Sequence, residues 1–277
     1  MNDRQKKYEA LLLSLKKLES AAVAFSAGTD SAFLLKTANK ALGGNVLALT
    51  ARSAVFPQSE LDEAAAFCKS EGIRHVFVDI DVINVPGFAE NPPDRCYICK
   101  KALFSRLKKC AEEFGMGTVL EGSNADDVKD YRPGMKAVKE LGIKSPLIEL
   151  GLTKDEIRLL SKDDGLSTWN KPSSPCLATR IAYGESITRE KVLMVEKAEL
   201  KLKELGFPKL RVRLRGKGAV IEVPSSDFSR MLDGETRENI VSYFSDLGFF
   251  YTSLDLAGFK SGSMNKELFQ KTVFTSS

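Results

Sequence analysis

A loop near the N-terminus, residues 25–31, has the residue types and spacing to bind a phosphate group. It joins a short apolar run to an amphipathic one, which predicts a strand, a tight loop and a helix. Backbone N–H groups at a helix start lack partners and stand at the positive end of the helix dipole, so they attract anions. Ser26 and Ser31 add hydroxyl donors, and Gly28 lets an anion approach the backbone closely. Asp30 can hold a cation or cap the helix. The alternative for the whole loop is an ordinary turn rich in Ser and Gly that binds no ligand.

A second polar loop, residues 122–127, follows a later apolar run and leads into residues 130–134. Carboxylates and an arginine after a strand suit a site for magnesium and pyrophosphate. Gly122 opens this loop, Asp126 would hold the metal, and Arg132 would neutralise the charge of the leaving group. A solvated turn with ordinary side-chain caps is the alternative.

Cysteines occur at a predicted helix start and in a loop, where packing does not require them. Cys96 and Cys99 are spaced so that two sulfurs can reach one metal, and Cys176 lies in a later loop rich in Pro and Ser. If both segments overhang the same strand ends, three thiolates converge and leave one iron of a [4Fe–4S] cluster, or one zinc position, open. A redox pair, or a pair without a role, is the alternative. Cys68 and Cys110 fall on apolar helix faces and are predicted to be core residues.

The order of the predicted elements indicates the fold that must position these loops. Strands alternate with amphipathic helices, the first three strands being residues 21–25, 46–50 and 75–80. This order, with short links, predicts an α/β domain with a doubly wound parallel sheet whose ligands bind at the carboxyl ends of the strands. The helix, strand, strand, helix and strand that follow predict a smaller C-terminal α+β domain. The predicted domains are residues 1–186 and residues 187–277.

The composition bounds the function classes. The chain has 277 residues and a net charge of +4, which permits an anionic substrate without requiring nucleic acid. No apolar run approaches the about 18 residues of a membrane-spanning helix. The polar N-terminus does not resemble a signal peptide, so a cytoplasmic protein with reduced thiols is expected. The single histidine, His75, argues against a histidine-based triad or a histidine-rich zinc site.

The sequence Ser-Ala-Gly-Thr-Asp-Ser at residues 26–31 resembles the Ser-Gly-Gly-x-Asp-Ser loop of the ATP pyrophosphatases, or PP-loop enzymes. These enzymes split ATP into AMP and pyrophosphate in order to adenylate a substrate. The resemblance implies an adenine nucleotide alpha hydrolase-like fold and a loop, Thr29 included, that binds ATP with Mg²⁺. Ala27 replaces the usual glycine, and its methyl group is expected to require a φ angle below zero. In the resembling enzymes the end of the second strand contacts adenine, which assigns that role to Thr50 and Ala51.

Motifs along nearly the whole chain resemble the LarE family, the ATP-dependent sulfur insertases of nickel-pincer nucleotide cofactor synthesis. The matching motifs are residues 26–31, 130–134, 169–171, 205–208 with 211–213, and 258–262. The resemblance implies adenylation of a carboxylate of pyridinium-3,5-biscarboxylic acid mononucleotide and its conversion to a thiocarboxylate, in two rounds. It also implies a homo-oligomer in which residues 187–277 serve substrate binding and oligomerisation.

The same resemblance assigns roles to individual residues. Some members of the family give up the sulfur of one cysteine, and members with three cysteines are thought to carry a [4Fe–4S] cluster that delivers sulfide. Cys96, Cys99 and Cys176 match the three-cysteine type, with Cys176 at the sulfur-donor position. Arg180 matches a position beside the reaction centre. The matches to the substrate-phosphate positions are Arg211, Arg213 and Lys260.

Other functions remain open at this point. A tRNA-thiolating PP-loop enzyme predicts a strongly basic surface and salt-sensitive RNA binding, which the mild charge disfavours. An amide-forming ATP pyrophosphatase that uses ammonia would not need the cysteines. A non-catalytic binding protein would release no pyrophosphate. Glu199, which matches a family acid with a proposed metal role, is expected to be an ordinary charge on a helix surface.

Overall fold

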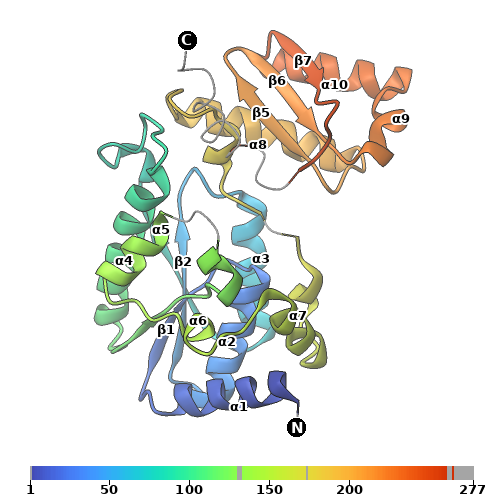
Figure 1. Ribbon diagram of the computed structural model, residues 1–277. Helices are drawn as coiled ribbons and strands as arrows, with labels where there is room; N and C mark the ends of the chain where they lie inside the picture. Colours follow the sequence, from blue (N-terminus) through green and yellow to red (C-terminus); the bar gives the residue numbers. More distant parts are fainter. Residues whose placement is uncertain (1, 130–132, 173, 261–263, 265–277) are drawn as a thin grey trace, which may run out of the picture. The chain divides into compact units, whose positions relative to one another are not determined.

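The computed structural model describes residues 2–129, 133–172, 174–260 and 264. The chain forms two compact units, which are described separately (Figure 1). The first unit comprises Met1–Val85 and Asp94–Ser174, and the second comprises Pro86–Pro93 and Pro175–Ser277. The sequence predicted a single boundary near Ser186. In the structure the second unit begins earlier, at Pro175, and also includes the short inserted segment Pro86–Pro93.

Asn91 explains why the inserted segment belongs with the second unit. It is buried and takes a left-handed backbone conformation, with φ +55°. Its side-chain amide donates to the backbone carbonyl oxygens of Ile181, Ala182 and Glu185 at 3.3, 2.6 and 3.1 Å. The backbone N–H of Gly184 donates in turn to the carbonyl oxygen of Asn91 at 3.0 Å. A turn that begins before residue 186 is therefore built around a residue from much earlier in the chain.

The first unit contains a four-stranded parallel sheet in the order β3-β2-β1-β4. The strands are β1 (Ala21–Ala24), β2 (Val46–Arg52), β3 (Arg74–Asp79) and β4 (Val119–Leu120). The strands are short and rich in Val, Leu and Ala, as expected for strands covered on both faces. The parallel α/β sheet confirms the fold class predicted from the sequence.

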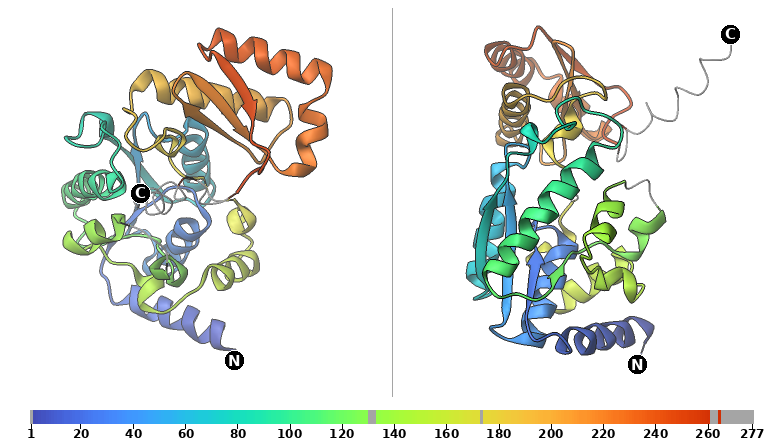
Figure 2. Two further views of the ribbon diagram at one scale, coloured as in Figure 1. Left: turned by 45° about the horizontal axis from the view of Figure 1, so that its top comes forward. Right: turned by 90° about the vertical axis from the view of Figure 1, so that its left-hand side faces the viewer.

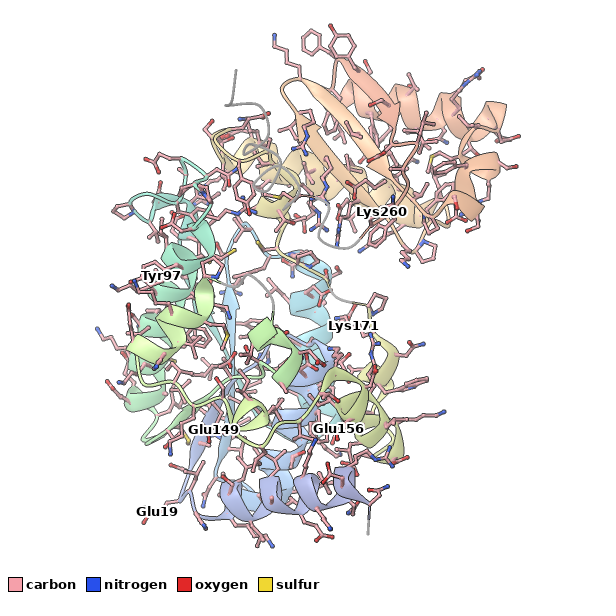
Figure 3. All side chains as sticks on the ribbon, in the orientation of Figure 1. Glu19, Tyr97, Glu149, Glu156, Lys171 and Lys260 are labelled. Atoms are coloured by element: carbon pink, nitrogen blue, oxygen red, sulfur yellow. The ribbon has the colours of Figure 1, made fainter. Side chains whose placement is uncertain are left out.

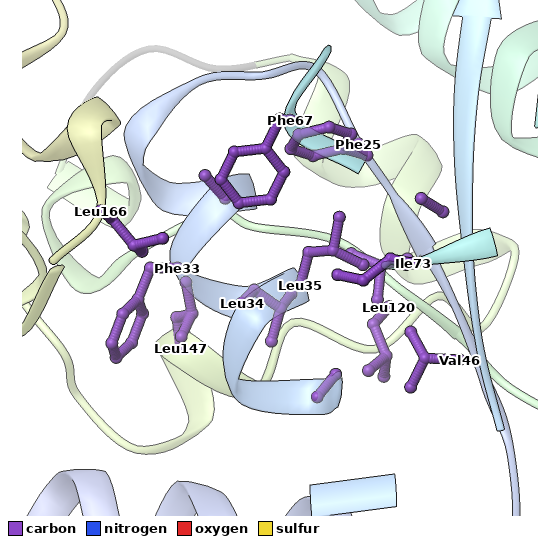
Figure 4. Close-up of a cluster of buried hydrophobic side chains, with 14 of the residues drawn as sticks. Phe25, Phe33, Leu34, Leu35, Val46, Phe67, Ile73, Leu120, Leu147 and Leu166 are labelled. Carbon is purple, nitrogen blue, oxygen red and sulfur yellow. The ribbon is translucent and has the colours of Figure 1, made fainter. Parts of the chain in front are cut away.

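Helices cover both faces of this sheet. They are α1 (Asp3–Lys16), α2 (Thr29–Leu42), α3 (Gln58–Ser70), α4 (Arg95–Glu113), α5 (Gly134–Glu140), α6 (Pro146–Glu149) and α7 (Lys154–Asp163), with short 3-10 helices η1 (Val82–Asn84), η2 (Ala125–Lys129) and η3 (Ser167–Asn170). Ala21 and Val23 pack against α2 on one face, in the cluster that Figure 4 shows, while Ala22 packs against α4 on the other. Alternate residues of one strand thus enter two separate cores, which makes the sheet doubly wound.

The strand order places two loops at one end of the sheet. The chain proceeds from β1 outward to β3 and then returns to the other side of β1 as β4, so the order reverses between β1 and β4. Ligands of open parallel sheets bind beyond the carboxyl ends of the strands at such a reversal. Here the loops that leave β1 and β4 are those that the sequence marked as polar and ligand-binding.

The second unit contains a three-stranded sheet in the order β5-β6-β7, with β5 and β6 antiparallel and β6 and β7 parallel. Its elements are η4 (Leu177–Arg180), α8 (Arg189–Glu204), β5 (Arg211–Arg215), β6 (Gly218–Glu222), η5 (Ser225–Asp227), α9 (Phe228–Met231), α10 (Gly234–Asp246) and β7 (Tyr251–Leu254). Figure 2 shows α8 and α10 on the same face of this sheet. The predicted order of helix, strand, strand, helix and strand is confirmed, with the short α9 added. Within the described part of the chain, no helix has the length and apolar character needed to cross a membrane.

Candidate active site

The loop after β1 forms an open cradle of hydrogen-bond donors at the start of α2. Gly28 precedes the first helical residue with φ −77° and ψ 161°, and no side chain caps the first turn. The hydroxyl oxygens of Ser26 and Ser31 lie 3.2 Å apart, and Ser31 Oγ donates to the carbonyl oxygen of Gly28 at 3.1 Å. A Cβ atom on Gly28 would lie 3.5 Å from Ser26 Oγ, so glycine leaves the space beside the hydroxyl groups open. This phosphate cradle, made of Ser26, Gly28, Ser31 and the first-turn N–H groups, fits a phosphate group.

Ala27 takes the left-handed backbone conformation, with φ +54°, so the expectation of a negative φ angle was wrong. Its side chain is 1% exposed and packs in the hydrophobic cluster around α2. The left-handed conformation costs a residue with a Cβ atom about 1 kcal/mol. Burial of the methyl group and hydrogen bonds to the loop offset this cost. The loop therefore keeps the conformation that a glycine usually supplies.

Asp30, on the first turn of α2, forms an ion pair with Lys154 at the start of α7. Both carboxylate oxygens accept hydrogen bonds from Lys154 Nζ at 2.8 Å, and Oδ2 also accepts from Asn124 Nδ2 at 3.3 Å. Burial raises the pKa of Asp30, and the Lys154 ammonium opposes that rise. The pair places a carboxylate that can hold a cation and an ammonium group that can contact an anion next to the phosphate cradle.

The loop after β4 packs directly against this helix start. A Cβ atom on Gly122 would lie 2.9 Å from the backbone nitrogen of Ser31 and 3.0 Å from its Cα, so only glycine allows this approach. The carboxylate of Asp126 accepts a hydrogen bond from the backbone N–H of Lys154 at 2.9 Å, which holds the start of α7 in place. Gly122 and Asp126 thus lie beside the starts of α2 and α7, while Arg132 lies outside the described residues.

Thr50 and Ala51 lie near the carboxyl end of β2, next to the point where β1 ends. Thr50 Oγ1 donates to the carbonyl oxygen of Phe25 at 2.8 Å, and His75 Nε2 lies 2.8 Å from the same hydroxyl oxygen. Because the single hydroxyl hydrogen of Thr50 goes to Phe25, the imidazole is the donor. Burial lowers the pKa of His75, which keeps the ring neutral. His75, which the sequence reasoning gave no role, thus fixes the first residue of the loop through Thr50.

The sequence reasoning also missed a segment that holds the loop from outside, η3 and the residue after it. Thr29 Oγ1 donates to the carbonyl oxygen of Thr168 at 2.8 Å, so this predicted nucleotide ligand uses its hydroxyl hydrogen within the protein. Lys171 Nζ donates to the carbonyl oxygen of Ala27 at 3.1 Å and pairs with carboxylates of α3 (Lys171 is labelled in Figure 3). No sequence pattern links residues this far apart, although residues 169–171 stood out as a motif.

In the second unit, Arg180 holds the loop that contains Cys176. Its guanidinium donates to both carboxylate oxygens of Glu199 at 2.8 and 3.0 Å, and to the carbonyl oxygen of Pro175 at 2.8 Å. It also donates to the hydroxyl oxygen of Thr179 at 2.9 Å. Glu199 is 6% exposed, so the prediction that it is an ordinary surface charge was wrong. Arg180 needs a buried carboxylate because its own side chain is buried.

Arg213 and Arg211 extend the positive charge along β5. Arg213 donates to both carboxylate oxygens of Glu222 at 2.9 and 3.2 Å. Arg211 donates to the backbone carbonyl oxygen of Lys260 at 3.2 Å and stacks 4.6 Å from the ring centre of Phe259. Burial, together with the charges of Arg213 and Arg180, lowers the pKa of Arg211 to about 10.

The arginine cluster is defined here as Arg180, Arg211 and Arg213 with Glu199 and Glu222. Among the described residues, Arg211 forms no ion pair with a carboxylate, so the cluster holds one guanidinium more than its carboxylates balance. Lys260 contributes its carbonyl oxygen to Arg211, and its side chain is exposed. A buried excess of positive charge suits a bound anion.

The cysteines divide between the two units. Cys96 and Cys99 lie in the first two turns of α4, and Cys176 immediately precedes η4 in the second unit. All three side chains are half-buried. In the ranges that the structure describes, no group of three or more His, Cys, Asp or Glu residues is arranged to hold a metal ion. Cys68 and Cys110 lie in the two hydrophobic cores, as predicted, and burial raises the pKa of Cys68 to about 12.

Comparison with known proteins places this geometry in context. No protein-family model matches the chain. It is 37% identical over 270 residues to the pyridinium-3,5-bisthiocarboxylic acid mononucleotide synthase of Lactiplantibacillus plantarum, covering 97% of each protein. It is 39% identical over 264 residues to an uncharacterised protein of Synechocystis sp., covering 95% of this chain and 98% of that protein. It is also 28% identical over 202 residues to a subunit of the glutamine-hydrolysing GMP synthase of Thermoplasma acidophilum, covering 67% of this chain and 64% of that protein.

The parallel sheet, the cradle at the end of β1 and the likeness to the GMP synthase subunit define an α/β enzyme with a PP-loop-like fold. The full-length likeness to the Lactiplantibacillus enzyme then settles the family. The chain belongs to the LarE family of pyridinium-3,5-bisthiocarboxylic acid mononucleotide synthases, which confirms the family that its motifs indicated.

Proposed function

We propose that this enzyme activates the carboxylates of pyridinium-3,5-biscarboxylic acid mononucleotide with ATP and converts them to thiocarboxylates. The observation that carries the proposal is the match to a synthase of the corresponding bisthiocarboxylic acid over nearly the whole of both chains. The phosphate cradle and the arginine cluster provide two chemically distinct places for the anions of such a reaction.

The first step is adenylation. A carboxylate oxygen of the substrate attacks the α-phosphorus of ATP, and the bond to pyrophosphate breaks. The cradle, built from Ser26, Gly28, Ser31 and the first-turn N–H groups, stabilises the negative charge that develops on pyrophosphate. Lys154 lies close enough to Asp30 to share this task. The carboxylates of Asp30 and Asp126 would hold Mg²⁺, which neutralises phosphate charge when bound.

The second step is sulfur transfer. A sulfur nucleophile attacks the acyl carbon, the bond to AMP breaks, and AMP leaves as an anion. Cys96, Cys99 and Cys176 supply thiolate donors of the kind that iron–sulfur clusters require, and a [4Fe–4S] cluster held there would supply hydrosulfide. Without a cluster, the thiolate of Cys176 would form a thioester with release of AMP. Loss of the Cα proton of Cys176 to a base, with cleavage of its Cβ–S bond, would then release the thiocarboxylate and leave dehydroalanine. Arg180 holds the backbone beside Cys176 and thereby fixes where the thiol stands.

The substrate carries a phosphate that does not react, and the arginine cluster suits it. Arg211 and Arg213 provide buried guanidinium groups, and the exposed side chain of Lys260 adds a further charge. Binding a phosphate there would neutralise the excess charge that the cluster now holds.

The chain passes between the two units at points that lie close in sequence to the cysteines of the proposed set. It passes between the units at 93/94 and at 174/175, and each cysteine of the set follows one of these points within a few residues. Homo-oligomeric assembly and a cytoplasmic location complete the proposal.

The product mass after incubation with ATP, Mg²⁺, a sulfide source and the dicarboxylate nucleotide tests the function. We expect exchange of carboxylate oxygen for sulfur, together with release of AMP and pyrophosphate.

Asp30→Ala and Ser31→Ala should each lower pyrophosphate release by about tenfold or more. An intact chromophore after anaerobic iron–sulfur reconstitution of Cys96→Ser would remove that residue from the cluster ligands. An amide product from ammonia, retained when all three cysteines are replaced by serine, would favour the chemistry that the GMP synthase likeness suggests.

A further inference from the structure

Lys171 uses all of its hydrogen-bond donors within the protein. Its ammonium group donates to the carbonyl oxygen of Ala27 at 3.1 Å, to Glu60 at 2.5 Å and to Glu63 at 2.6 Å. A lysine ammonium has three N–H donors, so none remains for a phosphate oxygen. The two carboxylates also outweigh its single positive charge. Lys171 therefore lies at the nucleotide loop without the properties of a phosphate ligand.

The acceptor that Lys171 contacts belongs to the strained residue of the loop. Ala27 has φ +54° in spite of its Cβ atom. The carbonyl group of Ala27 and the N–H group of Gly28 belong to one trans peptide and point in opposite directions. A hydrogen bond that fixes the carbonyl oxygen therefore also fixes the direction of the Gly28 N–H, which lies in the cradle.

A second contact holds the other side of Gly28. Thr29 Oγ1 donates to the carbonyl oxygen of Thr168 at 2.8 Å, and Thr168 lies three residues before Lys171 in the same segment. Ala27 and Thr29, the neighbours of Gly28, are thus both held by the segment from Thr168 to Lys171. Glu60 and Glu63 anchor this segment to α3, because both pair with Lys171.

We propose that Lys171 is a positioning residue that keeps the peptide between Ala27 and Gly28 oriented so that the Gly28 N–H faces the departing pyrophosphate. The inference rests on the proposed function, in which this loop binds the phosphates of ATP. Orientation of a donor matters most where charge develops, so the loss should fall on kcat rather than on KM for ATP.

A double-mutant cycle tests this role. Lys171→Met keeps the aliphatic stem and removes the ammonium, and we expect it to lower kcat for pyrophosphate release by about tenfold while KM for ATP changes less than about threefold. Ala27→Gly makes the left-handed conformation available without strain. We therefore expect Lys171→Met to lose less than about threefold in the Ala27→Gly background. Lys36→Met is the matched control. Lys36 lies farther along α2 and forms a half-buried ion pair with Glu71, the residue that follows α3.

The outcomes separate this inference from the function on which it rests. An equal loss from Lys171→Met in both backgrounds, or a loss that appears mainly in KM, would overturn the positioning role. Urea unfolding of the same four proteins gives an independent measure, in which we expect Lys171→Met to lower the midpoint more in the wild-type background than in the Ala27→Gly background. A wild-type enzyme that releases no pyrophosphate would defeat the proposed function, while the unfolding midpoints would still decide whether Lys171 supports the strained peptide.

Discussion

The phosphate cradle of the first unit and the arginine cluster of the second both suit anions, but their positive potential has different sources. The cradle uses backbone N–H groups, hydroxyl groups and a helix dipole, and the nearby lysines are paired with carboxylates. The arginine cluster uses full charges buried together, with one guanidinium more than its carboxylates balance among the described residues. Oriented neutral dipoles can stabilise charge as it develops, whereas buried charges bind an anion that is permanent. In the proposed reaction, the first kind of site suits the pyrophosphate that leaves and the second suits the phosphate that stays.

The largest expected effect is a loss of stability from unbalancing the arginine cluster. Glu199→Gln would leave Arg180 buried without a carboxylate partner, and removing one partner of a buried pair costs about 3 kcal/mol. Urea unfolding measures the change in the free energy of unfolding. Asp79→Asn, which breaks the exposed pair with Arg52, is the matched control and should cost much less. Equal losses in the two variants would show that burial does not distinguish these pairs.

The next effect concerns the geometry of the cradle. Gly122→Ala would place a methyl group 2.9 Å from the backbone nitrogen of Ser31, so the helix start or the β4 loop must move. We expect a stability loss of about 2 kcal/mol and a fall in pyrophosphate release of about tenfold or more. Gly117→Ala serves as control, since a Cβ atom there meets no other atom within 4 Å. A fully active Gly122→Ala enzyme would mean that the cradle tolerates displacement.

The arginine cluster should influence the two substrates unequally. Arg211→Met removes the guanidinium that lacks a carboxylate partner among the described residues, so we expect little change in the free energy of unfolding. KM for the dicarboxylate nucleotide should rise about tenfold, while KM for ATP stays within about twofold. Steady-state kinetics with each substrate varied in turn measures both constants. A parallel rise in KM for ATP would contradict the division of the two anions between the two sites.

The smallest expected effect is a pH dependence of stability caused by His75, which supports the cradle loop through Thr50. Burial lowers the pKa of His75 from its usual value of 6.5, so below that pH the unfolded chain binds a proton that the folded chain does not. Stability conferred by neutral His75 is therefore complete above the unfolded pKa and decreases as the pH falls below it. Unfolding midpoints measured from pH 7.5 to 5.5 should fall more for the wild type than for His75→Gln. Identical slopes would show that His75 does not titrate in this range.

The sequence predicted the elements of both regions better than it predicted their contacts. Hydrophobic periodicity located the strands, the helix after the cradle and the core cysteines, because local patterns record which face is buried. Glu199 was assigned to a helix surface, because its buried partner Arg180 and the strand beneath it become neighbours only in the folded chain. Ala27 was misjudged for a related reason, since local φ preferences do not include the contacts that hold a strained peptide. Lys171 stood within a recognised motif, but its acceptors on α3 and in the loop are far away in the sequence.

The inserted segment Pro86–Pro93 limits where the backbone of this enzyme can be divided into two fragments. Because it leaves the first unit, packs around Asn91 in the second and then returns, no single break in the backbone yields both units whole. A fragment that stops at Ser174 would retain Asn91 but lack the carbonyl groups that receive its amide. A fragment that starts at Pro175 would lack the asparagine that organises its first turn. Two co-expressed fragments divided at 174/175 would have to reassemble through the contacts of Asn91. Recovery of activity would then report that the two fragments had associated.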